Sequence, residues 1–154
     1  MNLYEEKFKT YMRDHSIQAE HLVFEASTHS VEEAARAAQV TPEDFVKNIC
    51  MIDTQANLIV AIVKGEDRAS TSRIGQILNI ERPRIANAEE ILEKTGYPVG
   101  GTPSFGYPAR FLIDPKVMEM KTVYTGGGSE NSLIRISTRE LVRANGGQIV
   151  RIRR

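Results

Sequence analysis

The chain has 154 residues, 41% of them hydrophobic and 26% charged, the composition of a globular protein long enough to bury its own core. Its 20 Lys and Arg balance 20 Asp and Glu, which argues against nonspecific nucleic-acid binding by a uniformly basic surface. The single cysteine, Cys50, excludes an intrachain disulfide and is typical of a reducing compartment. The charged start has no apolar signal core, and no window approaches the roughly 20 apolar residues of a membrane span. We therefore expect a soluble cytoplasmic protein with a single domain, residues 1–154.

Apolar periodicity and capping signals predict helices and strands in mixed order. Helices are expected over residues 2–15, 29–40, 70–80, 87–96 and 137–147, with one helical turn over 41–46. Strands are expected over residues 21–26, 46–52, 57–65, 83–86, 110–114, 121–126, 133–137 and 148–152, the second and third forming a hairpin. Ser30 and Glu33 predict a capping box for the second helix. Because helices and strands do not alternate strictly, we predict an α/β fold of the α+β type, with a mixed, mostly antiparallel sheet and flanking helices.

Lys47 lies within the apolar run "VKNICMI" and is the first candidate for chemistry. Its stem can run along apolar surface to bring the ammonium to water. It can also hold a partly buried ammonium at a sheet face, ready for an anionic or carbonyl group. Cys50, three residues on, faces the opposite side of a strand, so we predict an inert buried thiol.

Other titratable residues give weaker signals. His15, His21 and His29 lack metal-ligand spacing with one another or with Cys50, so we predict no metal site and no cofactor. The acidic residues at turns and strand ends have turn chemistry or solvation as their default role. Asp114, which precedes Pro115 after an apolar strand, fits either a structural or a site-supporting role.

Two glycine-rich loops stand out. In "GYPVGGTPSFGYP", residues 96–108, Gly100 and Gly101 permit close approach of another molecule, while Pro98 and Pro103 stiffen the flanks. "TGGGSENS", residues 125–132, lacks the Gly-Lys-Ser/Thr ending of a phosphate-binding loop and precedes a strand. Together with a strand lysine, these loops indicate a small-ligand pocket lined largely by backbone.

Three blocks of the sequence, read in order, resemble one known family. They are "HSVEEAARAAQVTPEDFVKNICMI", "TGYPVGGTPSFG" and "VYTGGGSENSLIRISTRELVRANGG". Their order and spacing are similar to the YbaK/ProX family, whose domain also occurs as the editing insertion of bacterial prolyl-tRNA synthetases. The resemblance covers nearly the whole chain from about Leu22 onward.

The resemblance implies the fold of that editing domain and a set of site residues. It implies catalytic roles for Lys47, Gly100 and Gly101. Substrate-binding candidates are Ser30, Thr102, Pro103, Ser104, Phe105, Asp114, Gly126, Gly127 and Gly128. The chain departs from the family pattern at Ser104, where proline is common, and at Asp44, where glutamine is frequent. The first departure bears on which amino acid the pocket accepts.

The resemblance also implies an activity. Members of this family hydrolyse the ester that joins a wrong small amino acid to a tRNA, often alanine or cysteine on proline tRNA. We expect a metal-free trans-editing deacylase that stabilises the oxyanion through backbone N–H groups, with help from the tRNA 2′-hydroxyl. Lys47 fits an electrostatic role, since an ordinary lysine is protonated at pH 7. The alternative is a non-catalytic adaptor that binds tRNA or a synthetase. The expected partners are mischarged tRNA and prolyl-tRNA synthetase, and either a monomer or a homodimer is compatible with the sequence.

Overall fold

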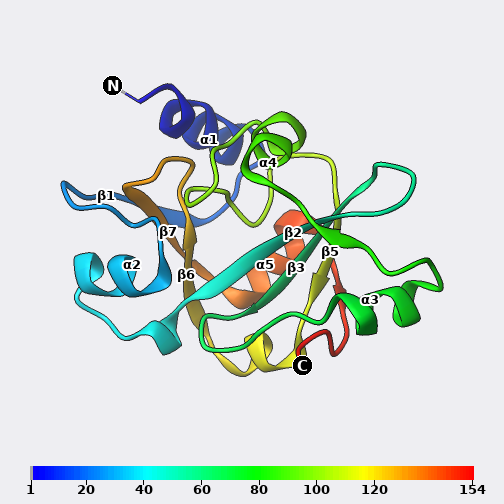
Figure 1. Cartoon of the computed structure of the whole chain (residues 1–154). Coiled ribbons are helices and arrows are strands. Elements are labelled where there is room, and N and C mark those ends of the chain that lie inside the picture. The colour runs from blue at the N-terminus through cyan, green and yellow to red at the C-terminus, as the bar shows by residue number, and fades with distance from the viewer. Residues whose placement is uncertain (1) are drawn as a thin grey trace.

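The computed structural model describes residues 2–154 (Figure 1). Its helices are α1 (Leu3–Asp14), α2 (Val31–Ala38), α3 (Thr71–Leu78), α4 (Ala88–Thr95) and α5 (Thr138–Asn145), with short 3₁₀ helices η1 (Pro42–Asp44) and η2 (Pro115–Glu119). Its strands are β1 (Ala19–Val23), β2 (Val46–Ile52), β3 (Leu58–Lys64), β4 (Arg84–Ile85), β5 (Arg110–Ile113), β6 (Thr122–Gly126), β7 (Ser132–Ser137) and β8 (Gln148–Ile149). This order confirms the predicted one, although β1 begins earlier than expected and β8 ends earlier. No helix among the described residues is long and apolar enough to cross a bilayer.

The strands form two sheets, where the sequence predicted one. Strands β1, β7 and β6 make an antiparallel sheet, and β4, β2, β3, β5 and β8 make a mixed sheet whose β3–β5 and β5–β8 pairs are parallel. Strands β2 and β3 form the predicted hairpin. The two sheets meet at one isolated bridge between Phe45 and Tyr124, whose rings stack 5.2 Å apart. Strands β2 and β6 form no further backbone pairs beyond this bridge, so they belong to two separate sheets.

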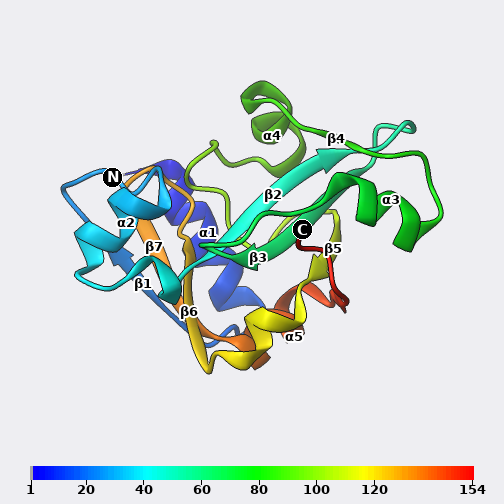
Figure 2. The same ribbon diagram turned by 60° about the horizontal axis from the view of Figure 1, so that its bottom comes forward.

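The sheets and helices are arranged in layers (Figures 1 and 2). The largest core cluster joins the five-stranded sheet to the three-stranded sheet and includes Phe8 of α1 and Leu141 of α5. A second cluster packs Ile74 of α3 against the other face of the five-stranded sheet. In a third, Ala34 and Ala35 of α2 pack with Phe45 and Leu133. The flanking helices of the prediction are therefore confirmed.

Helix starts follow the capping signals with one exception. The Ser30 hydroxyl accepts the Glu33 N–H at 3.1 Å, but among the described residues the Glu33 carboxylate makes no return bond, so the predicted capping box is half formed. On α1, Phe8 and Met12 face the core. Leu3, in the first turn of the same helix, is 79% exposed.

A buried polar cluster bridges the point where the sheets part. The Asn48 amide of β2 donates to the Thr102 carbonyl at 3.0 Å and to the Thr125 hydroxyl of β6 at 2.9 Å. Its carbonyl accepts the Ser104 hydroxyl at 2.7 Å, and that hydroxyl is also 2.7 Å from Thr125. Side chains thus replace the missing backbone ladder and connect β2, β6 and the 96–108 loop.

Asp114 fastens the C-terminal segment to the five-stranded sheet. Its fully buried carboxylate accepts the N–H groups of Lys116, Ile152 and Arg153 at 3.0–3.1 Å and pairs with the Arg153 guanidinium at 2.8 Å. Burial by itself would raise the pKa of Asp114, but these donors outweigh it and lower the pKa. The carboxylate therefore acts as a structural anchor.

We predict that Ser104→Ala destabilises the fold by about 1–3 kcal/mol, because it leaves the Asn48 carbonyl without its donor in a largely buried setting. Urea unfolding would measure this free energy. Ser72→Ala, at an exposed position of α3, is the matched control and should change stability by less than about 0.5 kcal/mol. Equal stability of the two variants would show that the cluster does not join the sheets.

We predict that Asp114→Asn lowers the free energy of unfolding at pH 7 by about 2–4 kcal/mol. Since the folded-state pKa of Asp114 lies below its unfolded value, the carboxylate stabilises the fold above its ordinary pKa. That contribution is lost as the pH falls through the lowered pKa. The difference in the free energy of unfolding between wild type and variant should therefore become smaller as the pH is lowered, as measured by urea unfolding. Glu119→Gln, at an exposed carboxylate in η2, should show no such difference.

Candidate functional site

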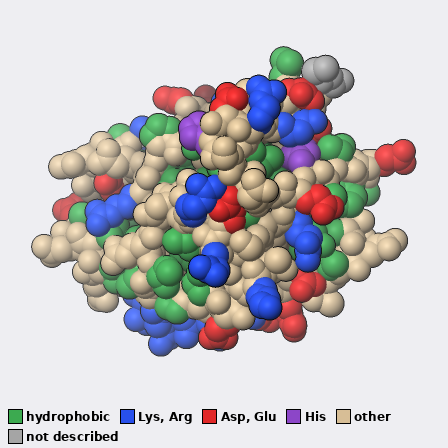
Figure 3. Space-filling view, turned by 180° about the vertical axis from the view of Figure 1, so that it is seen from behind, with side chains coloured by type: hydrophobic (Ala, Val, Ile, Leu, Met, Phe, Trp, Pro, Cys, Tyr) green, Lys and Arg blue, Asp and Glu red, His purple; other side chains and the backbone are tan. Residues whose placement is uncertain are grey.

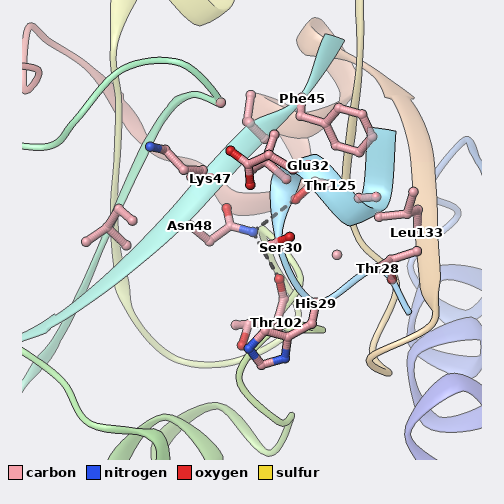
Figure 4. A pocket seen from close by; sticks show the side chains of 17 residues that line it. Thr28, His29, Ser30, Glu32, Phe45, Lys47, Asn48, Thr102, Thr125 and Leu133 are labelled. Carbon is pink, nitrogen blue, oxygen red and sulfur yellow. Dashed lines mark hydrogen bonds between the residues drawn. The ribbon is translucent and has the colours of Figure 1, made fainter. Parts of the chain in front are cut away.

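A cavity of about 410 Å³ opens where β2 and β6 part, and we call it the main cavity. Its walls come from three groups of residues. Around the start of α2 these are residues 28–32 and Ala34. On and just before β2 they are Phe45 and residues 46–49. The remaining lining residues are Gly65, Gly100, Thr102, Thr125, Gly126 and Leu133. Figure 4 shows Asn48 between Thr125 and Thr102, with His29 beside Thr102 and Lys47 on another side of the strand. The structure thus brings together the strand lysine and both glycine-rich loops.

Lys47 lies on β2, opposite Val63 of β3, and reaches the main cavity from a partly buried position. Within residues 2–154 no carboxylate lies within ion-pair distance of its ammonium. Burial and the positive charge of Arg68 lower the pKa of Lys47, against the opposing attraction of Asp67 and Glu32. The ammonium is therefore a donor without a fixed partner.

Backbone N–H groups supply the other free donors. Gly100 and Thr102 both line the main cavity, and among the described residues neither N–H meets an acceptor. Gly101 differs from this pair, since its N–H donates to the Pro98 carbonyl at 3.1 Å. The oxyanion donor that the sequence assigned to Gly101 is thus already engaged, whereas Gly100 and Thr102 keep theirs.

Close packing of the two loops explains the need for glycine at two positions. A Cβ on Gly101 would lie 2.5 Å from the Ser129 carbonyl group, and a Cβ on Gly126 would collide with the Thr102 carbonyl. The Gly128 N–H donates to the Gly101 carbonyl at 2.8 Å across the same junction. These glycines therefore let one loop lie directly on the other, with a wall of the main cavity at their junction.

Several predicted site residues lie behind the main cavity. Ser104 is fully buried and contacts Asn48 and Thr125, so it acts on the wall from the far side. Phe105 packs 5.1 Å from the Phe8 ring in the core. The Pro103 carbonyl accepts the Tyr107 hydroxyl at 2.6 Å.

Other predicted residues lie elsewhere. Gly127 and Gly128 belong to the β6–β7 hairpin, and a Cβ on Gly128 would lie 3.0 Å from the Tyr4 carbonyl of α1. Asp114 does not line the main cavity, because its carboxylate is engaged by the C-terminal segment. Of the predicted set, Lys47, Gly100, Ser30, Thr102 and Gly126 reach the main cavity.

Sequence reasoning missed five polar residues that line the main cavity: Thr28, His29, Glu32, Asn48 and Thr125. An amide in the middle of the apolar run "VKNICMI" was the available signal for Asn48, since a buried amide needs partners. Thr28 is buried, and its hydroxyl donates to the Glu130 carbonyl at 3.1 Å, a contact between segments far apart in sequence. Only the fold reveals that pairing.

Cys50 and the histidines do not form a reactive centre among the described residues. Cys50 is buried on the face of β2 opposite to Lys47, and burial raises the pKa of its thiol to about 12. His21 contacts the Gly127 carbonyl at 2.9 Å, and His15 contacts the Tyr11 carbonyl at 2.9 Å. No three His, Cys, Asp or Glu side chains within residues 2–154 converge as metal ligands.

Comparisons with known proteins agree with this geometry. The chain is 27% identical over 120 residues to the uncharacterized protein YwhH of Bacillus subtilis, covering 77% of this chain and 76% of that protein. It is 25% identical over 93 residues to a proline–tRNA ligase of Desulfotalea psychrophila, covering 60% of this chain but only 16% of the ligase. The fold matches a solved structure described as a candidate trans-editing enzyme for prolyl tRNA synthetase, with a TM-score of 0.91, 22% identity and coverage of 100% and 99% of the two chains. The family model of the aminoacyl-tRNA editing domain matches residues 25–144. Since this match spans most of the 154 residues, the protein belongs to the aminoacyl-tRNA editing domain family.

Proposed function

We propose that this protein hydrolyses the ester of a mischarged tRNA in trans, releasing a small amino acid such as alanine or cysteine from proline tRNA. The observation that carries the proposal is that Lys47, whose ammonium has no ion-pair partner among the described residues, lines the same cavity as Gly100 and Thr102, whose N–H groups have no acceptor. Positively polarised donors without protein partners are what a developing oxyanion requires. A deacylation assay on a panel of mischarged tRNAs tests the proposal. A non-catalytic adaptor would bind these tRNAs and release no amino acid.

In the proposed reaction the aminoacyl ester enters the main cavity with its carbonyl oxygen toward the Gly100 and Thr102 N–H groups. Water adds to the carbonyl carbon and gives up a proton, which is passed on to the leaving ribose oxygen, and the resulting oxyanion accepts these hydrogen bonds. The tetrahedral intermediate then collapses, the bond to the ribose oxygen breaks, and that oxygen takes up a proton. We propose that the neighbouring 2′-hydroxyl assists this proton transfer. Because the ester is already activated, the reaction proceeds without a metal or a protein nucleophile.

Lys47 contributes charge in this scheme. Its ammonium holds the terminal phosphate or the ester carbonyl and so orients the scissile bond. The ammonium is the form that interacts with an anion, so the lowered pKa of Lys47 limits the pH range in which it works.

The main cavity also accounts for the choice of a small amino acid. The lining of the main cavity also includes apolar residues, among them Val31, Ala34, Phe45 and Leu133. Phe45 and Leu133 are buried and belong to a packed cluster, so this wall does not yield easily to a larger side chain. A second, smaller site complements a synthetase pocket, which separates substrates differing by one methylene by only about 10–200-fold.

The proposed substrate also bears on tRNA recognition and location. Lysine and arginine side chains are interspersed with acidic ones over the face in Figure 3, in line with the zero net charge. We infer that recognition depends on local contacts at the acceptor end. A protein that acts on aminoacyl-tRNA works where translation takes place, so we propose a cytoplasmic location and prolyl-tRNA synthetase as a partner.

We predict that Lys47→Ala lowers kcat/KM for alanyl-tRNA by about 10²–10³-fold, because the transition state loses a charged donor. Single-turnover deacylation at neutral pH would measure the loss. Lys121→Ala, at an exposed lysine next to β6, is the matched control and should keep wild-type activity. Circular dichroism should show both variants folded. A folded Lys47→Ala protein with unchanged turnover would remove this residue from the mechanism.

We predict an alkaline loss of activity caused by deprotonation of Lys47. Since burial lowers the pKa of Lys47, kcat/KM corrected for spontaneous hydrolysis should begin to fall at a lower pH than an ordinary lysine would cause. Lys47→Arg keeps its charge, so its residual activity should lack this decline. A rise in rate over the same range would instead identify Lys47 as a general base.

A further inference from the structure

A second cavity, of about 530 Å³, lies beside the main cavity, and we call it the side cleft. It is lined by Asn2 and Tyr4 at the start of α1, Glu25 and Ser27 in the loop after β1, Pro98, and residues 129–131 of the β6–β7 hairpin. In Figure 2 the start of α1 stands beside the loop that leads to α2. None of the residues assigned above to the chemistry lines the side cleft.

The side cleft and the main cavity are next to each other along three separate segments. Ser27 lines the side cleft, while the next residue, Thr28, lines the main cavity. Likewise, Pro98 lines the side cleft and Gly100 lines the main cavity. At the border, His29 Nδ1 of the main cavity lies 3.8 Å from Glu130 Oε1 of the side cleft. These two side chains are 49% and 58% exposed, so their contact does not close the border between the main cavity and the side cleft. A chain leaving the main cavity can therefore continue into the side cleft.

The charges of the side cleft disfavour phosphate. Its lining includes Glu25 and Glu130 and, among the described residues, no lysine or arginine. Carboxylates accept hydrogen bonds from amino groups and repel phosphate oxygens. The site is therefore suited to an uncharged group that carries N–H donors.

The remaining side chains suit a planar heterocycle. The side-chain carbonyl of Asn2 caps α1 by accepting the N–H groups of Tyr4 and Glu5 at 2.9 and 3.2 Å. The side-chain NH₂ group of Asn2 is left as a donor. Tyr4 lines the side cleft and is 36% exposed, so its ring can offer a stacking surface. Pro98 adds a second apolar surface. An aromatic ring, an amide donor and carboxylate acceptors together recognise a base with an exocyclic amino group.

We propose that the side cleft binds the base of the nucleotide that precedes the terminal adenosine, which is cytosine in tRNA. The proposal rests on the function proposed above, because the terminal nucleotide must then occupy the main cavity. Tyr4 stacks on the cytosine, and Glu130 or Glu25 accepts from its 4-amino group. Asn2 donates to the ring nitrogen or the carbonyl oxygen of the base. The side cleft thereby reads the conserved end of the tRNA next to the reacting ester.

Two alanyl-tRNAs that differ only in this nucleotide test the proposal. RNA ligation of an alanylated cytidylyl-adenosine or uridylyl-adenosine to a shortened tRNA yields ends with cytosine or uracil at the tested position. For the wild-type protein we expect kcat/KM to be roughly five- to tenfold higher with cytosine, the size of one base-edge discrimination. Glu130→Gln, Glu25→Gln or both together should bring this ratio toward one, since an amide can also donate to the uracil carbonyl. Glu20→Gln, at an exposed carboxylate on β1, is the control and should keep the ratio.

The stacking role is tested by Tyr4→Ala, which should lower kcat/KM for the cytosine substrate about tenfold, mainly through KM. Tyr4→Phe should retain activity, and Leu3→Ala, at the exposed neighbouring position, should behave like wild type. Equal kcat/KM for cytosine and uracil with wild type, or a Tyr4→Ala loss confined to kcat, would overturn the proposal while leaving the deacylase function intact. No hydrolysis of either alanyl-tRNA would instead reject the deacylase function with alanine and this inference with it.

Discussion

The architecture of the site depends on the parting of β2 and β6. A continuous ladder between these strands would make one sheet and close the space in which the main cavity lies. The ladder stops after the Phe45–Tyr124 bridge, and hydrogen bonds among Asn48, Ser104 and Thr125 take its place. A side-chain cluster of this kind stabilises the junction while leaving an opening on one side. The same interaction therefore holds the sheets together and shapes the floor of the site.

The two glycine-rich loops are also closely packed against each other. Gly101 and Gly126 allow the 96–108 loop and the β6–β7 hairpin to approach until their backbones touch. The hairpin is in turn tied to α1, since the Ser129 hydroxyl donates to the buried Glu5 carboxylate at 2.6 Å. Phe8 of α1 packs on Tyr97 and Phe105 of the 96–108 loop. The N-terminal helix, which lies outside the segment matched by the family, thus braces both loops of the site.

The two adjoining cavities differ in the charged residues that line them. The main cavity is lined by Lys47 and Glu32 and by Gly100 and Thr102, whose N–H groups have no acceptor among the described residues. The side cleft presents Glu25 and Glu130 and repels negative charge. We propose that a nucleotide chain with an ester at its end binds with the ester in the main cavity and the preceding base in the side cleft.

The sequence by itself determined the order of the elements, the α+β class and the family. Apolar periodicity, caps and turn residues are local signals, and they placed β2, β3 and the helices close to their observed positions. It also singled out Lys47 and both glycine-rich loops, because a charge in an apolar strand and clustered glycines are visible without a fold.

Tertiary structure alone decided where each of these residues lies and what it contacts. Ser104 and Phe105 stand in the same loop as Gly100, but they face the core, and Asp114 is engaged by a segment 38 residues away. The Asn48 cluster, the division into two sheets and the side cleft join segments far apart in the chain. Long-range pairing depends on how strands and loops pack in three dimensions, and local sequence patterns do not specify that packing.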